Sequence, residues 1–373
     1  LDHPFAGVYG TKMIPNNQFS VEARFQRLVE AIKLVYASTF FRGARQYLRS
    51  VGQPPLAEKM AVIVQEVVGE RHGDRFYPAV SAVARSYNYY PSGHARPEDG
   101  VVNLALGLGC QIVDGGLSWG FAPPYPKAPP PFNDLRDLLK NTQTRFWSVH
   151  MGRPPVPDPL RETEYLVQAP LSVAETDGTL GFLASTYDPE SDRLRPGLGA
   201  RGPRVLDFAP LLSGTTVPLP ALLRRLLALC EDALGTAVEV ELALDLDPRH
   251  GVPARLGFLQ VRPMMVSHEE VSVAEADLRG AGVLLASEQV LGNGTRDDIV
   301  DIVYLKPDAF DARHSRTIAR DLEPINAALA EEGRPYLLVG FGRWGSSDPW
   351  LGVPVEWSQI GGAATIVEAT LPA

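Results

Sequence analysis

Two short stretches, VEVELAL (238–244) and LGFLQVRP (256–263), decide how this chain is interpreted. Successive side chains of a β-strand point to opposite faces, so the two glutamates of the first stretch share one face. Its valines and leucines share the opposite face, and Gln260 and Arg262 share a face of the second stretch. The pattern predicts two strands that each present one apolar face to a core and one polar face.

The two polar faces meet if the strands form an antiparallel hairpin that turns at about His250–Gly251. Symmetric pairing then places Glu241 opposite Gln260 and Glu239 opposite Arg262. Carboxylate and amide oxygens are ligands that Mg²⁺ prefers, at about 2.1 Å, and a guanidinium stabilises charge on a transferring phosphoryl group. The pattern fits a Mg²⁺–ATP site, and the alternative is a cross-strand ion pair between Glu239 and Arg262 on a solvated face.

Composition limits the remaining choices. The chain has 373 residues with a formal net charge of −9, which argues against a broad nucleic-acid surface. Its two cysteines, Cys110 and Cys230, form no metal-binding or disulfide pattern, which favours a reducing compartment. No apolar run is long enough to span a bilayer, so a cytoplasmic protein without a membrane partner is expected.

The segments before the hairpin predict helices and then strands. Apolar residues at helical spacing from Phe25 to Tyr36, after a candidate N-cap at Ser20, predict an amphipathic helix. A second helix is predicted over residues 38–51, with arginines three to four residues apart that indicate a solvated face or, alternatively, a phosphate site. Those arginines are Arg42, Arg45 and Arg49.

Three apolar segments then predict strands, beginning with a buried strand at MAVIVQEVV (60–68). The others are RFYPAVSAVARSYN (75–88) and VVNLALGLG (101–109). The proline-rich residues 121–160 predict an ordered surface excursion or insertion, and residues 219–234 predict a helix closed by Gly235.

The C-terminal part predicts a second, smaller α/β unit over residues 282–373, after an acidic linker at 269–281. Its helix is expected over residues 315–332. Its strands are expected around VLLAS (283–287), DIVYL (301–305), YLLVGFG (336–342) and ATIVEA (364–369). The segment GFGRWGSSDPWLGVPVEW (340–357) could be a rigid aromatic binding loop with Arg343 and Asp348 as polar groups, or a packed turn.

Two glycine-rich segments could approach a ligand closely or form plain turns. They are FAGVYGT (5–11) and GLGCQIVDGG (107–116). The seven histidines form no metal-spaced pair, and the chain has no GxSxG elbow, which argues against a nucleophilic hydrolase.

In this order the segments resemble the ATP-grasp domain of the phosphoenolpyruvate synthase / pyruvate phosphate dikinase family. PFAGVYGTKMIPNN is similar to its glycine loop, and MAVIVQEVV to its strand leading to the adenine. SAVARS is similar to its SGVxxT strand, GLGCQIVDGG to its GLGExxVxG segment, and VEVELAL with GFLQVRPM to its D/E-x-E and Q-x-RP pair. The resemblance implies a mixed α+β, ATP-grasp-like fold over residues 1–268 and a swivelling-like domain at 282–373.

The resemblance also implies roles for particular residues. Glu239, Glu241 and Gln260 would bind Mg²⁺ and nucleotide, and Arg262 would contact phosphate, with Glu241 and Arg262 as the catalytic pair. Gln65 and Val67 would lie near the adenine of ATP. The glycine segments would contribute Gly7, Thr11, Gly107, Gly109 and Gly115. The implied function is Mg²⁺-dependent phosphoryl transfer from ATP towards a histidine carrier.

Departures from the family pattern leave other functions open. The family's N-terminal lysine and RSS-type arginine are expected before Leu1, the acidic residue of GLGE is Cys110, and no GGxTxH-type histidine motif is found. The expected partners are therefore an N-terminal lobe and a phosphohistidine domain of the same protein, with a homodimer as one candidate assembly. The alternatives are a non-catalytic nucleotide-binding regulatory module and a scaffold that docks partners through its prolines.

Overall fold

The computed structural model describes residues 7–50, 59–89, 91–128, 135–214, 217–246, 254–264, 273, 277–287, 290, 295–346 and 352–370. The chain forms two compact units. Unit 1 comprises residues 1–11, 32–63 and 295–373, and unit 2 comprises residues 12–31 and 64–294. Helices and several sheets occur together, which confirms the mixed α+β class. The predicted domain limits of 1–268 and 282–373 divide the chain differently and stay a prediction.

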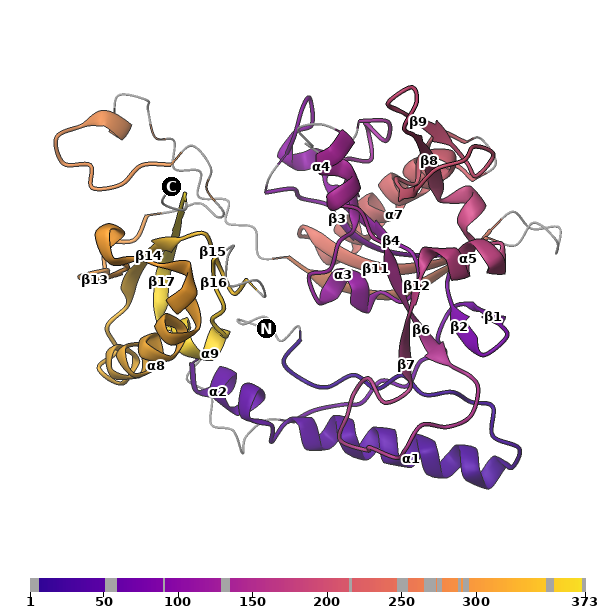
Figure 1. Cartoon of the computed structure of the whole chain (residues 1–373). Coiled ribbons are helices and arrows are strands. Elements are labelled where there is room, and N and C mark those ends of the chain that lie inside the picture. The colour runs from indigo at the N-terminus through magenta and orange to yellow at the C-terminus, as the bar shows by residue number, and fades with distance from the viewer. Residues whose placement is uncertain are drawn as a thin grey trace. The chain divides into compact units, whose positions relative to one another are not determined.

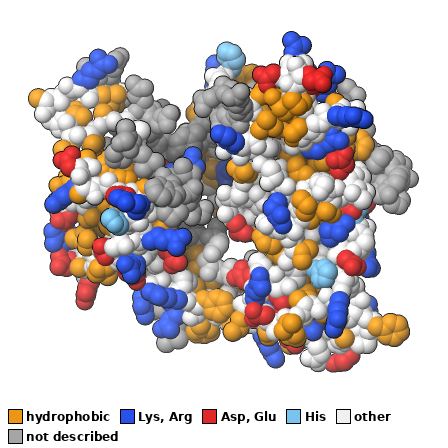
Figure 2. Space-filling model, viewed as in Figure 1, with side chains coloured by type: hydrophobic (Ala, Val, Ile, Leu, Met, Phe, Trp, Pro, Cys, Tyr) orange, Lys and Arg blue, Asp and Glu red, His pale blue; other side chains and the backbone are white. Residues whose placement is uncertain are grey.

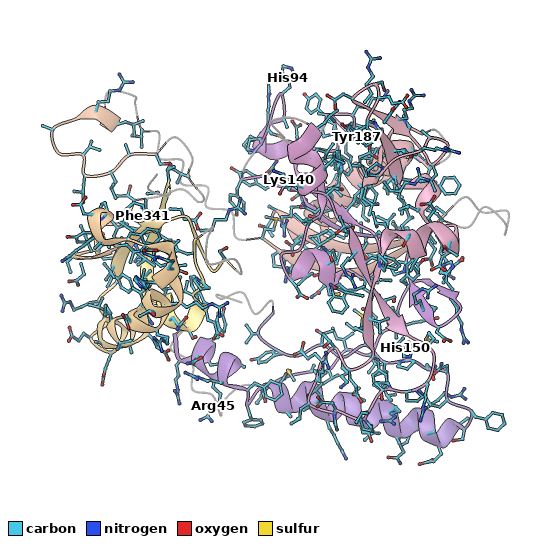
Figure 3. The ribbon with its side chains drawn as sticks, viewed as in Figure 1. Arg45, His94, Lys140, His150, Tyr187 and Phe341 are labelled. Atoms are coloured by element: carbon cyan, nitrogen blue, oxygen red, sulfur yellow. The ribbon has the colours of Figure 1, made fainter. Side chains whose placement is uncertain are left out.

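Two helices open the described chain, as the apolar spacing predicts. Helix α1 spans Val21–Ser38 and begins after Ser20, whose hydroxyl accepts a hydrogen bond from the Ala23 amide at 3.1 Å. Helix α2 spans Arg42–Ser50. Its buried side chains are Ala44 and Leu48, and Arg45 is an exposed side chain of the same helix (Figure 3). The exposure of this arginine fits the solvated-face interpretation.

The centre of unit 2 is a five-stranded antiparallel sheet in the order β12-β11-β3-β4-β5 (Figure 1). Its strands are β3 (Val80–Arg85), β4 (Val101–Ala105), β5 (Trp119–Phe121), β11 (Val238–Asp245) and β12 (Arg255–Pro263). Thus β11 is an inner strand between β12, its neighbour in sequence, and β3, which lies far away in the chain.

Helix α7 (Leu219–Leu234) packs its apolar side against this sheet. Leu223 of the helix and Val240 of β11 are fully buried in the same hydrophobic core. The helix ends at Gly235, whose φ of 69° is the left-handed conformation that a C-terminal glycine adopts readily. The predicted limits of this helix and the apolar face of β11 are confirmed.

Two smaller sheets complete unit 2. One has the order β1-β2-β6-β7, and the other β10-β8-β9. Their strands are β1 (Glu70–His72), β2 (Arg75–Tyr77), β6 (Arg145–His150), β7 (Leu166–Pro170), β8 (Ala184–Asp188), β9 (Arg193–Pro196) and β10 (Arg204–Leu206). The short helices are α3 (Cys110–Val113), α4 (Leu135–Lys140), α5 (Leu171–Asp177) and α6 (Ala209–Ser213).

The proline-rich stretch 121–160 contributes to the interior as well as the surface. Strand β6 lies within it, and Phe146 of β6 is fully buried in the main core of unit 2. A surface excursion therefore does not describe residues 145–150, because alternating apolar residues after the prolines pack inwards.

Unit 1 contains a parallel sheet in the order β13-β14-β17. Its strands are β13 (Asp301–Tyr304), β14 (Tyr336–Phe341) and β17 (Ala363–Ala369), beside the short pair β15 (Arg343–Trp344) and β16 (Gly352–Val353). Helices α8 (Ser315–Glu331) and α9 (Trp357–Ile360) share a core with β14. The helix and three of the strands predicted for this region are confirmed.

Two predicted strands are wrong, and a third, predicted over 75–88, is divided at Pro78 into β2 and β3, which belong to different sheets. Residues 60–68 form no strand, and Ile63 and Val64 are 81% and 60% exposed. Residues 283–287 also form no strand, and Leu284 is 71% exposed. A run of apolar residues forms a buried strand only if a neighbouring strand pairs with it and other elements pack over it. Neither of these two segments joins a sheet.

Charged groups of both signs are mixed over the face drawn in Figure 2. Among the residues described, the helices are all too short or too polar to cross a membrane.

Candidate functional site

The predicted hairpin register is confirmed. Strands β11 and β12 are antiparallel, with Glu239 opposite Arg262 and Glu241 opposite Gln260. The predicted turn at His250–Gly251 lies outside the described residues. A bulge at Leu259 follows the Glu241–Gln260 pair, and the pairing then resumes from Leu242 opposite Phe258 to Asp245 opposite Arg255. The site proposed from sequence therefore occupies one end of the two-stranded ladder.

Glu239 lies at the centre of a ladder of charges across three strands. Its Oε1 accepts a hydrogen bond from Arg262 Nε at 2.6 Å and another from Arg262 Nη2. Its Oε2 accepts from Nε of Arg85 on β3 at 2.5 Å, and Arg85 is its register partner on that side. The carboxylate side chain is 8% exposed, whereas the two guanidinium groups are each about a third exposed. The cross-strand ion pair considered as the alternative is therefore present.

This ladder restricts what Glu239 can ligate. Both of its oxygens already accept charge-assisted hydrogen bonds, which are among the stronger contacts of a folded protein. A metal ion at Glu239 would have to displace a guanidinium. The predicted metal role of Glu239 stays a prediction, and the described geometry assigns it the holding of two arginines.

Glu241 has a different environment on the same polar face. It is half-buried, and in the part of the chain that the structure describes its carboxylate has no hydrogen-bond or ion-pair partner. Burial raises the pKa of Glu241 above the ordinary 4.5, and nearby Glu239 raises it further, while Arg262 and Arg85 lower it. A half-buried carboxylate with free lone pairs gains most from an incoming cation.

Gln260, opposite Glu241, is the second predicted oxygen ligand. It is exposed on β12, the edge strand of the sheet. In the described ranges no three His, Cys, Asp or Glu side chains converge into a metal site. Glu241 and Gln260 alone would leave most of the coordination sphere of Mg²⁺ to water and phosphate, which is how Mg²⁺ is usually held beside nucleotides.

The second glycine segment follows β4 on the same sheet. Gly107 has φ of 83°, and a Cβ there would lie 2.5 Å from the Trp147 carbonyl oxygen, so a side chain is excluded. Its own carbonyl accepts a hydrogen bond from the Ser81 hydroxyl at 2.7 Å. Gly109 precedes α3, and Gly115 follows it with φ of 74°.

This glycine segment is separated from the charged ladder along the sheet. Asn103 of β4 pairs with Val83, which pairs with Glu241, so these three residues mark one level of the sheet. Gly107 follows Asn103 by four residues, about 13 Å at the rise of an extended chain. Ser81 shares the face of Val83 by strand alternation. The turn at Gly107 thus lies over the polar face, away from the end that carries Glu239.

The predicted adenine-contact residues lie beside β12. The Gln65 amide donates a hydrogen bond at 2.8 Å to the carbonyl of Leu259, the residue next to Gln260. Val67 packs in a small cluster that includes Leu108 of the second glycine segment. These contacts bring Gln65 close to the predicted site without a regular strand.

The first glycine loop belongs to unit 1. Gly7 has φ of 71° and Thr11 is exposed. Because the other predicted site residues belong to unit 2, the expected convergence of this loop on them stays a prediction. Lys12, which follows it, belongs to unit 2 and pairs with Glu164 at 2.6 Å, each side chain being 4% exposed.

The arginines of α2 offer a weak alternative phosphate site. Arg42 and Arg49 line a cavity of about 1350 Å³ within unit 1, together with Arg296 and Arg334. Three of these four guanidinium groups already pair with carboxylates, namely those of Glu323, Asp298 and Asp301. The pairing leaves little unbalanced positive charge, so the solvated-face interpretation is preferred.

The Gly/Trp/Pro segment fits its packed interpretation where it is described. The Trp344 indole donates a hydrogen bond to the Val367 carbonyl at 3.3 Å and packs in the core of unit 1. Arg343 is exposed, and Asp348 lies outside the described residues. The described part of the segment is therefore structural.

Sequence reasoning missed Arg85. The residue ends SAVAR in β3, and its alternation with Val83 places it on the polar face of the sheet. The available signal was a charged residue that ends an otherwise apolar strand. The pairing of β3 with β11 could not be predicted from the sequence, because the two strands lie about 150 residues apart in the chain.

Comparison with known proteins gives one positive finding. The family model described as "Pyruvate phosphate dikinase, AMP/ATP-binding domain" matches residues 1–280, about three quarters of the chain. A search among curated proteins returned no match. The matched residues include every predicted site residue of both units.

Proposed function

The chain belongs to the pyruvate phosphate dikinase AMP/ATP-binding domain family, and we propose that it binds Mg²⁺–ATP on the polar face of β11 and β12 for phosphoryl transfer towards a histidine carrier. The observation that best supports this proposal is the strand register, which places Glu241 opposite Gln260, two residues from Arg262 on the same face of β12. This arrangement puts two oxygen ligands and one cation within a single ladder of the sheet.

Each group has a role that follows from its surroundings. Glu241 and Gln260 hold the metal, because their oxygens are the ones without a guanidinium partner among the described residues. Bound Mg²⁺ would neutralise charge on the ATP phosphates. Arg262, whose side chain is a third exposed, contacts a phosphate with the part of its guanidinium that does not donate to Glu239, while Glu239 fixes its orientation.

The remaining parts of the site come from the glycine segments and Gln65. The turn from Gly107 to Gly109 is proposed to lie beside the nucleotide, and the φ of 83° at Gly107 is a conformation that glycine adopts readily. Gln65, held by Leu259, is the residue proposed to lie near the adenine. The histidine acceptor would be in a phosphohistidine domain of the same cytoplasmic protein, reached by the swivelling-like residues 282–373.

Calorimetric titration of the chain with ATP, with and without Mg²⁺, tests the proposal. The unaltered chain should bind ATP more tightly with Mg²⁺. Glu241→Gln should remove the Mg²⁺ effect, and Arg262→Gln should weaken binding by about tenfold or more. Glu175→Gln, which removes an ion pair to Arg204 in another sheet, is the matched control and should bind like the unaltered chain. Equal affinities in all four proteins would refute the assignment.

A second candidate, a non-catalytic nucleotide-binding module, is favoured by Cys110. The thiol stands where the family pattern has an acid, and burial raises its pKa to about 12, so it is neutral at physiological pH. A neutral thiol cannot replace a carboxylate in an ATP-dependent reaction. An acid-labile phosphate on the protein after incubation with ATP would exclude this candidate, and nucleotide binding without any such phosphate would support it.

A further inference from the structure

The contacts of Arg85 exceed what the fold requires. One guanidinium would neutralise the buried carboxylate of Glu239, and Arg262 already does so with two nitrogens. Arg85 adds a second full positive charge at 2.5 Å through its Nε. The three side chains therefore carry one net positive charge, next to the carboxylate of Glu241 on the same face of the sheet.

The outer edge of Arg85 remains available. Its Nη1 makes a long contact of 3.4 Å with the Asn103 side-chain oxygen, and the side chain is 34% exposed. In the described part of the chain Nη2 has no partner. A planar guanidinium held at Nε and open at its terminal nitrogens is preorganised to bind an oxyanion.

The position of Arg85 matches the proposed nucleotide site. Arg85 and Arg262 flank Glu239 from the two strands next to β11, so their backbones lie about 10 Å apart across the sheet. Glu241 is two residues further along β11 on the same face. It lies towards the end of the sheet at which the Gly107 turn follows β4. An anion held at Glu241 through a metal ion would thus have both arginines on one side, about 7 Å further along the sheet at the level of Glu239.

We propose that Arg85 is a second phosphate-binding residue, which contacts a phosphate group of the nucleotide that Arg262 does not. The inference rests on the proposed function, because it takes the ligand of this face to be a nucleoside polyphosphate. No bond is made or broken at Arg85. Its charge and its fixed orientation on Glu239 select ligands with several phosphates over those without any.

Titration with Mg²⁺–ATP and with adenosine tests the proposal in Arg85→Gln, Arg85→Lys and the unaltered chain. Arg85→Gln should weaken ATP binding by about tenfold while adenosine binding is unchanged, so the ratio of the two affinities falls. Arg85→Lys should recover part of the ratio, because it keeps the charge without the fork. The control is Arg204→Gln, whose guanidinium is also partly buried and paired with a carboxylate. It should leave the ratio unchanged.

The outcomes distinguish a failure of this inference from a failure of the proposed function. An unchanged ratio in Arg85→Gln, or a parallel loss of ATP and adenosine binding, would mean a structural role only and would overturn this inference while the proposed function stands. If the unaltered chain binds no ATP, the proposed function fails and this inference falls with it.

Discussion

The substitution Glu239→Gln tests whether the charged ladder holds β3, β11 and β12 together. Three hydrogen bonds from two guanidinium groups converge on this carboxylate, including those of 2.5 and 2.6 Å from the two Nε atoms. A glutamine keeps one acceptor oxygen but turns its amide donor towards the other arginine. At least one charge-assisted bond is lost, and two arginines remain close together with Glu241 as their nearby counter-charge.

The expected loss is about 2–3 kcal/mol, no more than one hydrogen bond to a charged group contributes, because each arginine is a third exposed and screened by water. Since each 1.4 kcal/mol is a factor of ten, the amides of β11 should exchange with solvent roughly 30 to 150 times faster. Hydrogen exchange resolved to peptides covering 238–245 measures this within unit 2 alone. The control Glu175→Gln, in α5, removes a carboxylate that is more exposed and should change exchange in the sheet that contains its partner Arg204 by about tenfold at most. Exchange of β11 that stays unchanged would refute the reasoning.

Three other perturbations have defined outcomes. Burial raises the pKa of Glu241, and Mg²⁺ binds the deprotonated carboxylate, so the affinity for Mg²⁺–ATP should fall as the pH is lowered from about 8 to about 5, before ordinary glutamates titrate. Glu241→Gln should abolish this pH dependence, and an unchanged affinity of the unaltered chain across the range would contradict the prediction. Gly107→Ala should destabilise unit 2 by about 2–4 kcal/mol in urea unfolding, because its Cβ would lie 2.5 Å from a carbonyl oxygen. Gly115→Ala places its Cβ more than 4 Å from other atoms and should destabilise unit 2 by only about 1–2 kcal/mol, so equal losses of stability would contradict the packing argument. Lys12→Met should destabilise the chain by about 3–5 kcal/mol by leaving the Glu164 carboxylate without its counter-charge, and adding Glu164→Gln should restore much of the loss. Full stability of Lys12→Met in the same unfolding assay would contradict the buried-pair argument.

The register of the site could be predicted because strand alternation leaves little freedom. Two polar residues spaced by one apolar residue occur in each of β11 and β12, and an antiparallel pairing that buries both apolar faces matches them in one way. The end of α7 could likewise be predicted from the glycine at position 235. Local patterns were sufficient where the interacting segments are neighbours in sequence.

The rest depended on contacts between distant segments. Arg85 engages Glu239 only because β3 pairs with β11, and no local pattern in either strand states that pairing. Residues 60–68 have the composition of a buried strand, yet the bulge in β12 leaves the Leu259 carbonyl to accept the Gln65 side chain at 2.8 Å. Composition therefore predicted which residues are apolar, and tertiary pairing decided which of them form strands.

A crystal structure of the chain with Mg²⁺ and a non-hydrolysable ATP analogue tests the central claim most directly. The account predicts a metal ion within about 2.1 Å of oxygens of both Glu241 and Gln260, with the phosphates beside Arg262. A nucleotide bound elsewhere in the chain, with Glu241 and Gln260 making no contact to the metal ion, would contradict it.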